Sequence, residues 1–382
     1  MKFVFHSPTK VNFGSIDYSA LCNEINSYGN KILILSGGES TTSIAFQVQN
    51  SIQSFQKDYQ ITLINGIQSN PLGSKIEEIK ANTIKPEVII SVGGGSIHDS
   101  AKALSILFTH QGNVEQFTVD GIIGVTGITH NTIPIITIPT IFGSGAEISP
   151  AALIRICDKK RIIYSPNIFP KSTFVNPKFA LSANRQCILY SALDAFVQGI
   201  ESYVSAFSQD YSVNFSLSAI RRIVSCLIKY KSNLNNSNAL EQIALSANES
   251  MNAIMQSSVG AIHALSDPLS GLFNLHHGAA VGFLLPAVIN ANYPFATEKY
   301  NYLQRIIDSK LGVSHDSLRD SIIAFYEQID FDYESIGQKL KDCGIEKKID
   351  QCVIDSFNND LEGNPRLLDN QTIKEIFYSA LR

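Results

Sequence analysis

The first half of the chain alternates short apolar runs with longer amphipathic stretches. The run 31–35 (KILIL) is rich in β-formers and ends in small residues at 36–38, a helix-like stretch follows to Ser54, and the next apolar run begins at Ile61. Segment 86–108 repeats this order, with a continuous apolar run, three glycines and a helix-like stretch, and the run in 134–147 also ends in small residues. Continuous apolar runs are typical of parallel strands buried on both faces. We therefore predict an α/β fold whose ligand crevice lies at the carboxyl ends of the strands.

The pattern changes near Ser182. Segments 187–206 and 216–234 carry apolar residues at three- and four-residue spacing without strand-like alternation. We predict an α/β domain over residues 1–181 and an all-α domain over 182–382. Thr372 and Glu375 fit a capping box and predict that the last helix begins there.

Composition restricts the class of protein. The chain has 382 residues and is 44% hydrophobic, enough for two domains with substantial cores. Its 30 basic and 34 acidic residues give a net charge of −4 without a basic run, which argues against a nucleic-acid partner. Six scattered cysteines without a CxxC pair indicate reduced thiols. The N-terminus lacks a signal-peptide pattern and no long uncharged apolar run occurs, so we expect no membrane association and a cytoplasmic location.

A glycine-rich loop follows the apolar run of segment 86–108. At 93–96 (GGGS), backbone N–H groups could approach an anion closely, with the following helix directing the positive end of its dipole at it. The spacing is not GxGxxG, so a tight turn that needs glycine is the alternative interpretation. Taken singly, Asp99 and Lys102 on that helix are expected to be surface or capping charges.

Four motifs, in order, resemble the iron-containing (group III) alcohol dehydrogenases. SVGGGSIHDSAKAL (91–104) is similar to GGGSxxDxAK, and IPTIFGSGAEIS (138–149) to PTTxGTGSEVT. LDAFVQGIESYVS (193–205) resembles DAxxHxxEAYxS, while 260–278, beginning GAIHALSDPLSG and ending HHG, resembles GxxHxxAHxLGxxxxxPHG. NPR at 364–366 adds to the likeness, which covers nearly the whole chain.

The resemblance implies a Rossmann-like dinucleotide-binding N-terminal domain, an all-α metal-binding C-terminal domain, and hydride transfer between them, in the architecture shared with dehydroquinate synthase. A homodimer is expected on the same ground. By the family pattern, Gly94, Gly95 and Ser96 hold the pyrophosphate with Asp99 close by. The other cofactor positions implied are Thr140, Phe142 and Ser149, which line the adenine and nicotinamide sites, and Lys160, which reaches the cofactor.

The resemblance also implies a divalent metal, Fe²⁺ or Zn²⁺. Asp194, His263 and His277 match three metal ligands. Gln198 stands where the family commonly has histidine, and its carbonyl oxygen could coordinate from the helical face of Asp194. An amide is uncharged and a weaker ligand than imidazole. Asp267 replaces a second histidine expected near the substrate; it could relay protons, repel an acidic substrate or bind the metal.

The choice between NAD and NADP depends on the turn after the first apolar run. Many family members place an aspartate there, which binds the ribose hydroxyls and repels a 2′-phosphate. This chain has Gly37, followed by Glu39 and Ser40. Because Glu39 could take over the role of that acid, we expect NAD, with NADP as the alternative.

The function that follows is a metal-dependent NAD(P)-linked oxidoreductase that interconverts an alcohol and an aldehyde or ketone. A cation at the substrate oxygen lowers the pKa of the hydroxyl, and the nicotinamide carries the hydride. One alternative is oxidation of the terminal hydroxyl of a sugar acid such as 3-deoxy-manno-octulosonate. Others are a lyase of the dehydroquinate synthase type, and a metal-free or inactive relative suggested by Gln198 and Asp267.

Overall fold

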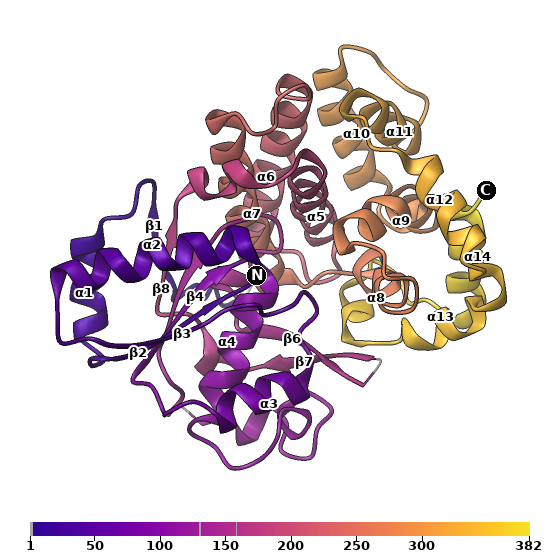
Figure 1. The fold of residues 1–382 in the computed structure, drawn as a ribbon. Coiled ribbons are helices and arrows are strands. Elements are labelled where there is room, and N and C mark those ends of the chain that lie inside the picture. The colour runs from indigo at the N-terminus through magenta and orange to yellow at the C-terminus, as the bar shows by residue number, and fades with distance from the viewer. Residues whose placement is uncertain (1–2, 130, 158) are drawn as a thin grey trace. The chain divides into compact units, whose positions relative to one another are not determined.

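The computed structural model describes residues 3–129, 131–157 and 159–382 (Figure 1). Its contacts divide the chain into two compact units. The α/β unit comprises the described residues of 7–141 and 145–183. The helical unit comprises 3–6, 142–144 and 184–382, so a short loop of the first half of the sequence packs with the second half.

The α/β unit is built on a six-stranded sheet in the order β1-β8-β5-β4-β2-β3, and every strand pairing is parallel. The predicted parallel sheet is therefore confirmed. The strands are β1 (Lys10–Phe13), β2 (Lys31–Ser36), β3 (Gln60–Ile64), β4 (Val88–Gly93), β5 (Ile135–Pro139) and β8 (Ser172–Val175).

Helices cover both faces of this sheet, as the continuous apolar runs predict. Ile32 and Ile34 of β2 pack with α1 and α2, whereas Leu33 and Leu35 point to the opposite face and pack with α3 and α4. The helices are α1 (Tyr18–Asn26), α2 (Glu39–Phe55), α3 (Gly73–Ala81) and α4 (Gly95–Leu107).

The strand order reverses between β2 and β4. The chain runs from β2 outward to β3, then returns to β4 on the other side of β2 and continues to β5. Ser36 pairs with Val92 at the carboxyl ends of the two strands, and a Cβ on Gly37 would lie 3.3 Å from Cδ1 of Ile97 on α4. Such a switch point is where open α/β sheets bind ligands. Both glycine turns singled out in the sequence flank it.

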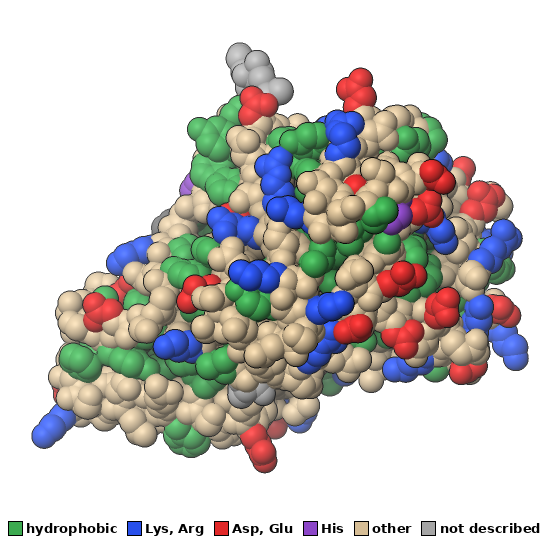
Figure 2. All heavy atoms as spheres, turned by 90° about the horizontal axis from the view of Figure 1, so that it is seen from above, with side chains coloured by type: hydrophobic (Ala, Val, Ile, Leu, Met, Phe, Trp, Pro, Cys, Tyr) green, Lys and Arg blue, Asp and Glu red, His purple; other side chains and the backbone are tan. Residues whose placement is uncertain are grey.

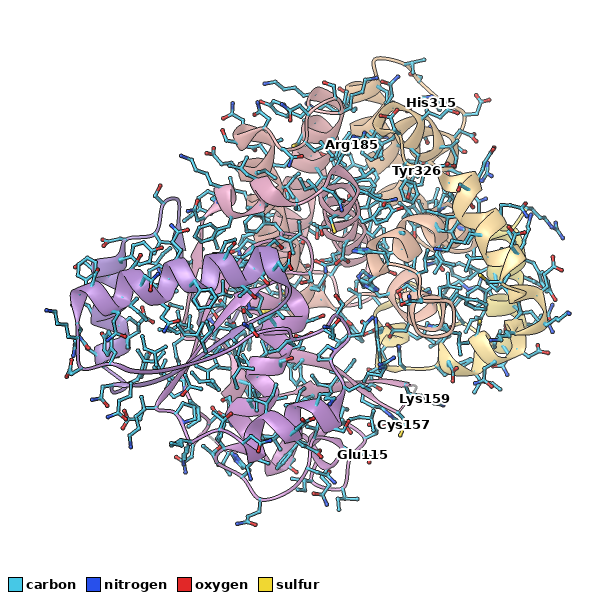
Figure 3. All side chains as sticks on the ribbon, viewed as in Figure 1. Glu115, Cys157, Lys159, Arg185, His315 and Tyr326 are labelled. Atoms are coloured by element: carbon cyan, nitrogen blue, oxygen red, sulfur yellow. The ribbon has the colours of Figure 1, made fainter. Side chains whose placement is uncertain are left out.

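An antiparallel hairpin of β6 (Ala151–Ile156) and β7 (Lys159–Tyr164) packs on this unit, and the sequence patterns did not predict it. Cys157 and Lys159 lie at its tip (Figure 3). Lys160 is on β7, opposite Arg155.

Helices make up nearly all of the helical unit, as predicted. Almost the whole surface of α5 is buried from Ile188 onward, against α6, α7 and α9. Arg185 fixes the start of α5 by donating to the carbonyl of Ile329 and to Asp330 after α11 (Figure 3). The helices are α5 (Arg185–Val204), α6 (Asp210–Lys229), α7 (Ser237–Ser257), α8 (Ala261–Phe273), α9 (His277–Asn292), α10 (Thr297–Leu311), α11 (Leu318–Ile329), α12 (Tyr333–Asp342), α13 (Ile349–Asp355) and α14 (Asn370–Ala380).

The last helix begins earlier than predicted. Its N-cap is Asp369, whose carboxylate accepts from the backbone N–H of Thr372, so Thr372 lies inside α14 rather than at its cap. Across the described residues, no helix combines the length and apolar character that crossing a bilayer requires. Basic and acidic side chains are interspersed over the face seen in Figure 2.

Candidate functional site

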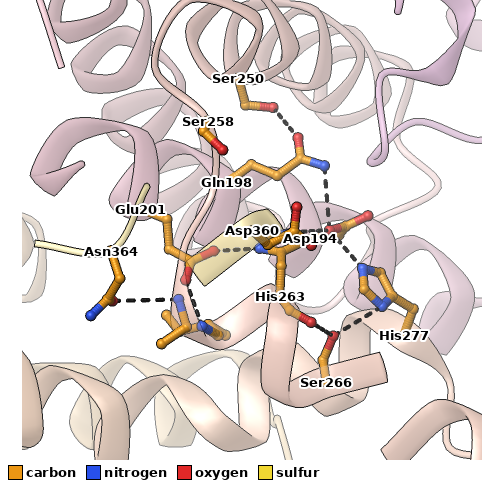
Figure 4. A network of polar contacts seen from close by, with 12 residues as sticks. Asp194, Gln198, Glu201, Ser250, Ser258, His263, Ser266, His277, Asp360 and Asn364 are labelled. Atoms are coloured by element: carbon orange, nitrogen blue, oxygen red, sulfur yellow. Dashed lines mark hydrogen bonds and ion pairs between the residues drawn. The ribbon is translucent and has the colours of Figure 1, made fainter. Parts of the chain in front are cut away.

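Asp194, His263 and His277 converge inside the helical unit (Figure 4). One ligand atom from each lies within 4.8 Å of the other two. Nε2 of His263 is 3.4 Å, and Nε2 of His277 is 3.7 Å, from Oδ1 of Asp194. The three residues come from α5, α8 and the first position of α9, so packing of three helices brings them together.

The turn between α8 and α9 positions His277. Asn274 ends α8 in the left-handed region with φ of 51°, a conformation that asparagine tolerates. His276 caps α9 by accepting from the N–H of Gly278. A Cβ at Gly278 would collide with the carbonyl of Tyr190 on α5, so glycine allows α9 to begin directly against α5. His276 is thus a capping residue, and its neighbour His277 faces the cluster.

Burial differs across the cluster. Asp194 and His263 are buried, while the side chain of His277 is 30% exposed, so the cluster opens to solvent beside His277. Burial acts to raise the pKa of Asp194, but His277 and His263 hold that pKa below its ordinary value. Burial alone would lower the pKa of His263, whereas Glu201 and Asp194 raise it to about 10. The carboxylates of Asp194 and Glu201 therefore favour the positively charged form of His263.

Glu201 is a member of this network that the sequence interpretation missed. Its Oε2 lies 2.5 Å from Nδ1 of His263, and its Oε1 accepts from the backbone N–H of Ile262 at 2.6 Å. A signal was present in the sequence, because Glu201 follows Asp194 by seven residues, two helical turns along one face of α5.

Gln198 lies beside the cluster on α5 with its oxygen turned away from Asp194. Oε1 accepts from the hydroxyl of Ser250 at 2.9 Å. Nε2 is 3.3 Å from the carbonyl of Ser144 and 3.5 Å from Oδ1 of Asp194. The amide therefore presents its nitrogen, rather than its oxygen, to the carboxylate.

Asp267 is half-buried on α8, one turn after His263. The negative charge of Asp267 interacts with Asp360, which lies in the short 3₁₀ helix Asn359–Gly363. Burial and the charge of Asp267 raise the pKa of Asp360 to about 7. Asp360, which sequence patterns did not single out, adds a second acidic group on this side of His263 (Figure 4).

The predicted phosphate loop connects β4 and α4. Gly94 is the N-cap of α4, and Gly95 and Ser96 form its first turn. The hydroxyl of Ser96 accepts from the N–H of Asn70, and Thr140, directly after β5, donates its N–H to the carbonyl of Gly93. The structure therefore brings Gly94, Gly95, Ser96 and Thr140 to the carboxyl edge of the sheet.

Asp99 and Lys102 do not lie on the surface, in contrast to the expectation for each charge alone. Lys102 is fully buried and donates to the carbonyls of Ala146 and Ala151 and to the hydroxyl of Ser149. Burial lowers the pKa of Lys102 to about 8 and raises that of Asp99 to about 6, although the ammonium lies 3.9 Å from Asp99. Lys102 thus ties α4 to the segment before β6 and to the first residue of β6, and Ser149 is one of its acceptors.

The remaining candidate cofactor residues lie in three places. Gly37 is buried after β2 and donates its N–H to Thr41, while Glu39 and Ser40 are exposed in the first turn of α2. Phe142 is buried within the loop that packs with the helical unit. Lys160 is half-buried on β7, where its charge offsets a small part of the rise that burial causes in the pKa of Asp99.

Comparison with known proteins identifies the family. The family model for iron-containing alcohol dehydrogenases matches residues 8–177, and the model for the C-terminal part of the same family matches residues 188–381. The chain therefore belongs to the iron-containing alcohol dehydrogenase family, a class of alcohol and aldehyde oxidoreductases.

Individual relatives are distant but align over most of their length. The 1,3-propanediol dehydrogenase of Klebsiella pneumoniae is 24% identical over 328 residues, which are 84% of this chain and 83% of the relative. The NAD-dependent methanol dehydrogenase of Bacillus methanolicus is 23% identical over 351 residues, covering 89% of each chain. The crystal structure of an iron-containing alcohol dehydrogenase from Thermotoga maritima has a TM-score of 0.82 at 21% identity, covering 100% of this chain and 99% of that one. This last likeness shows the fold.

Proposed function

We propose that the chain is a metal-dependent, NAD(P)-linked oxidoreductase that interconverts a small alcohol and its aldehyde or ketone. The observation that carries this proposal is the convergence of Asp194, His263 and His277, with ligand atoms within 4.8 Å of one another. Membership of the iron-containing alcohol dehydrogenase family supports the same reaction class.

The residues present fit a divalent cation. One carboxylate and two imidazoles form a donor set that suits Fe²⁺ and Zn²⁺, and three protein ligands leave positions open for a substrate. Nε2 of His263 is buried and makes no hydrogen bond, as expected of a nitrogen that is aimed at a cation. We assign Asp194, His263 and His277 as the ligands.

A cation held there would lower the pKa of a substrate hydroxyl and stabilise the charge left on oxygen. The surrounding side chains would handle the proton and select the substrate. Asp267 is our candidate for proton transfer, since it is a half-buried carboxylate one turn from His263. The charge of Asp267, which also raises the pKa of Asp360, disfavours an anionic substrate through repulsion, so a neutral alcohol fits better than a sugar acid.

For the cofactor, we propose that the α/β unit binds a dinucleotide at the switch point between β2 and β4, with its pyrophosphate at Gly94, Gly95 and Ser96. Glu39, at the start of α2, favours NAD because a carboxylate there repels a 2′-phosphate. The Bacillus methanolicus relative is NAD-dependent by name, in agreement with this preference.

The test is a substrate panel on purified protein, followed at the nicotinamide absorbance with NAD and NADP. Short alcohols, diols and a sugar acid are compared after chelation and after addition of Fe(II) or Zn(II) under anaerobic conditions. We expect chelation to abolish turnover and one of the two metals to restore it. A protein that binds neither metal stoichiometrically, and that oxidises no alcohol after reconstitution, would contradict the proposal.

A further inference from the structure

We propose that Glu201 is a positioning residue of the metal centre, because it holds the Nδ1–H of His263 and so reserves Nε2 as the ligand atom. This inference rests on the proposed function, since it assigns a role toward the cation that Asp194, His263 and His277 would bind. Histidines that bind metals usually donate their second ring N–H to a carboxylate or carbonyl, which fixes the ring and its tautomer.

The geometry around His263 carries this assignment. The imidazole lies between two buried carboxylates, with Nδ1 2.5 Å from Oε2 of Glu201 and Nε2 3.4 Å from Oδ1 of Asp194 (Figure 4). Glu201 is only 4% exposed. A carboxylate without its proton only accepts hydrogen bonds, so Glu201 requires a proton on Nδ1. The lone pair for a metal is then on Nε2, the nitrogen that faces Asp194.

The second oxygen of Glu201 fixes the direction of the carboxylate. Oε1 accepts from the N–H of Ile262 at the start of α8, where free backbone donors and the helix dipole favour negative charge. Gly260 precedes α8 and makes room for this contact, since a Cβ there would lie 3.2 Å from Oε1. Glu201 thus joins α5 to the N-terminus of α8 and orients the histidine that follows.

Neighbouring amides reinforce the same end of α8. Oδ1 of Asn364 accepts from the N–H of Ala261 and from Nδ2 of Asn292 on α9. Glu201 and Asn364 thereby satisfy two consecutive N–H groups of the helix. Of these two caps, only Glu201 also contacts a candidate metal ligand, which separates its role from that of a simple helix cap.

Glu201→Gln tests the role with little change of volume. An amide has one oxygen and one NH₂ group, so it cannot accept from both Ile262 and Nδ1. If the oxygen faces Ile262, the NH₂ group requires a bare Nδ1, the proton moves to Nε2, and Nε2 no longer binds a cation. If the oxygen faces Nδ1, the NH₂ group opposes the N–H of Ile262. Either arrangement weakens metal binding, by about 10- to 100-fold for loss of such a partner.

The experiment measures Zn(II) affinity by competition with a chromophoric chelator, together with the imidazole N–H resonances of the Zn(II)-loaded protein labelled with ¹⁵N in its histidines. The wild type should bind one Zn(II) and show a downfield, exchange-protected Nδ1–H signal. Glu201→Gln should bind about 10- to 100-fold more weakly and lose that signal. Glu249→Gln is the matched control, because this carboxylate also accepts from other side chains, Ser218 and Arg222, and should leave both readouts unchanged.

The outcomes separate this role from the proposed function. A wild type without stoichiometric Zn(II) overturns the proposed function and the role of Glu201 with it. Equal affinity and an unchanged N–H signal in Glu201→Gln overturn the role of Glu201 alone. Circular dichroism of the chelated variants reports folding. If Glu201→Gln does not fold, Glu201→Asp keeps the charge but shortens the reach to Nδ1, and the same loss of signal and affinity is expected.

Discussion

The side-chain nitrogen of Gln198 donates to Oδ1 of Asp194, one helical turn away on α5, at 3.5 Å. Its oxygen is held by the hydroxyl of Ser250. An amide nitrogen has no lone pair to offer a cation. In this orientation Gln198 supports Asp194, and only a half-turn of the amide would bring its oxygen to the cluster.

Gln198→His should bind Zn(II) at least as tightly as the wild type, and on the order of tenfold more tightly (about 1.4 kcal/mol) if the new imidazole coordinates. The reason is that imidazole is a better ligand for borderline cations than an amide. Competition titration with Zn(II) measures the change, and Ser250→Ala controls for loss of the hydrogen bond to the amide. Weaker binding in a folded Gln198→His protein would show that the side chain at this position does not face the metal.

The parallel sheet and the glycine turns could be predicted because the central strands β2, β4 and β5 are buried on both faces and their runs of apolar residues are nearly continuous. The hairpin of β6 and β7 was missed, since its strands are only partly buried and mix charged with apolar positions. The start of α14 was misplaced because Asp369 and Thr372 both have capping side chains, and a single sequence does not show which one bonds the helix.

In the candidate site, too, some residues could be predicted from the sequence and others could not. The three residues Asp194, His263 and His277 could be named from the family motifs. The burial of Lys102 could not, because a lysine is normally exposed and only the folded chain supplies its three acceptors. Glu201 lies on the same helical face as Asp194, but its role depends on where α8 begins, which sequence periodicity does not fix.

The adjacent histidines at the start of α9 should behave differently. His277→Ala removes a candidate ligand, so we expect loss of bound metal and a fall in turnover of about 100-fold or more. His276→Ala removes the cap on the N–H of Gly278 and the ring contact with Tyr190 but no candidate ligand, so it should keep the metal at a cost of about 0.5–2 kcal/mol in stability. Metal analysis and thermal unfolding distinguish the two. Metal loss in His276→Ala with His277→Ala still loaded would reverse the assignment.

The cofactor preference should depend on Glu39. Glu39→Gln removes the charge expected to repel a 2′-phosphate, so the ratio of kcat/KM with NADP to that with NAD should rise about tenfold, or 1.4 kcal/mol. Ser43→Ala, at an exposed position one turn further along α2, keeps the charge and should leave the ratio unchanged. A ratio that does not move in Glu39→Gln would place the ribose away from α2.

Stability should fall in acid because of His98 on α4, whose Nδ1 is bonded to the hydroxyl of Ser91 at 2.8 Å. Burial lowers the pKa of His98 to about 3, whereas an unfolded histidine titrates near 6.5. Between these values the unfolded chain binds a proton that the folded chain does not, so stability is complete above about pH 6.5 and is lost as the pH falls toward 3. At pH 5 the loss is about 2 kcal/mol.

His98→Asn removes the titrating group and keeps a polar partner for Ser91. The variant should be less stable than the wild type at pH 8, and this difference should shrink by about 2 kcal/mol at pH 5. Urea unfolding of the chelated proteins at the two pH values measures it, with His6→Asn at an exposed position as the control that should retain the pH dependence of the wild type. If the difference in free energy of unfolding between wild type and His98→Asn were equal at pH 5 and pH 8, this prediction would be wrong. His98 would then bind its proton in the folded protein as readily as in the unfolded chain, as a charged imidazole in the core around α4.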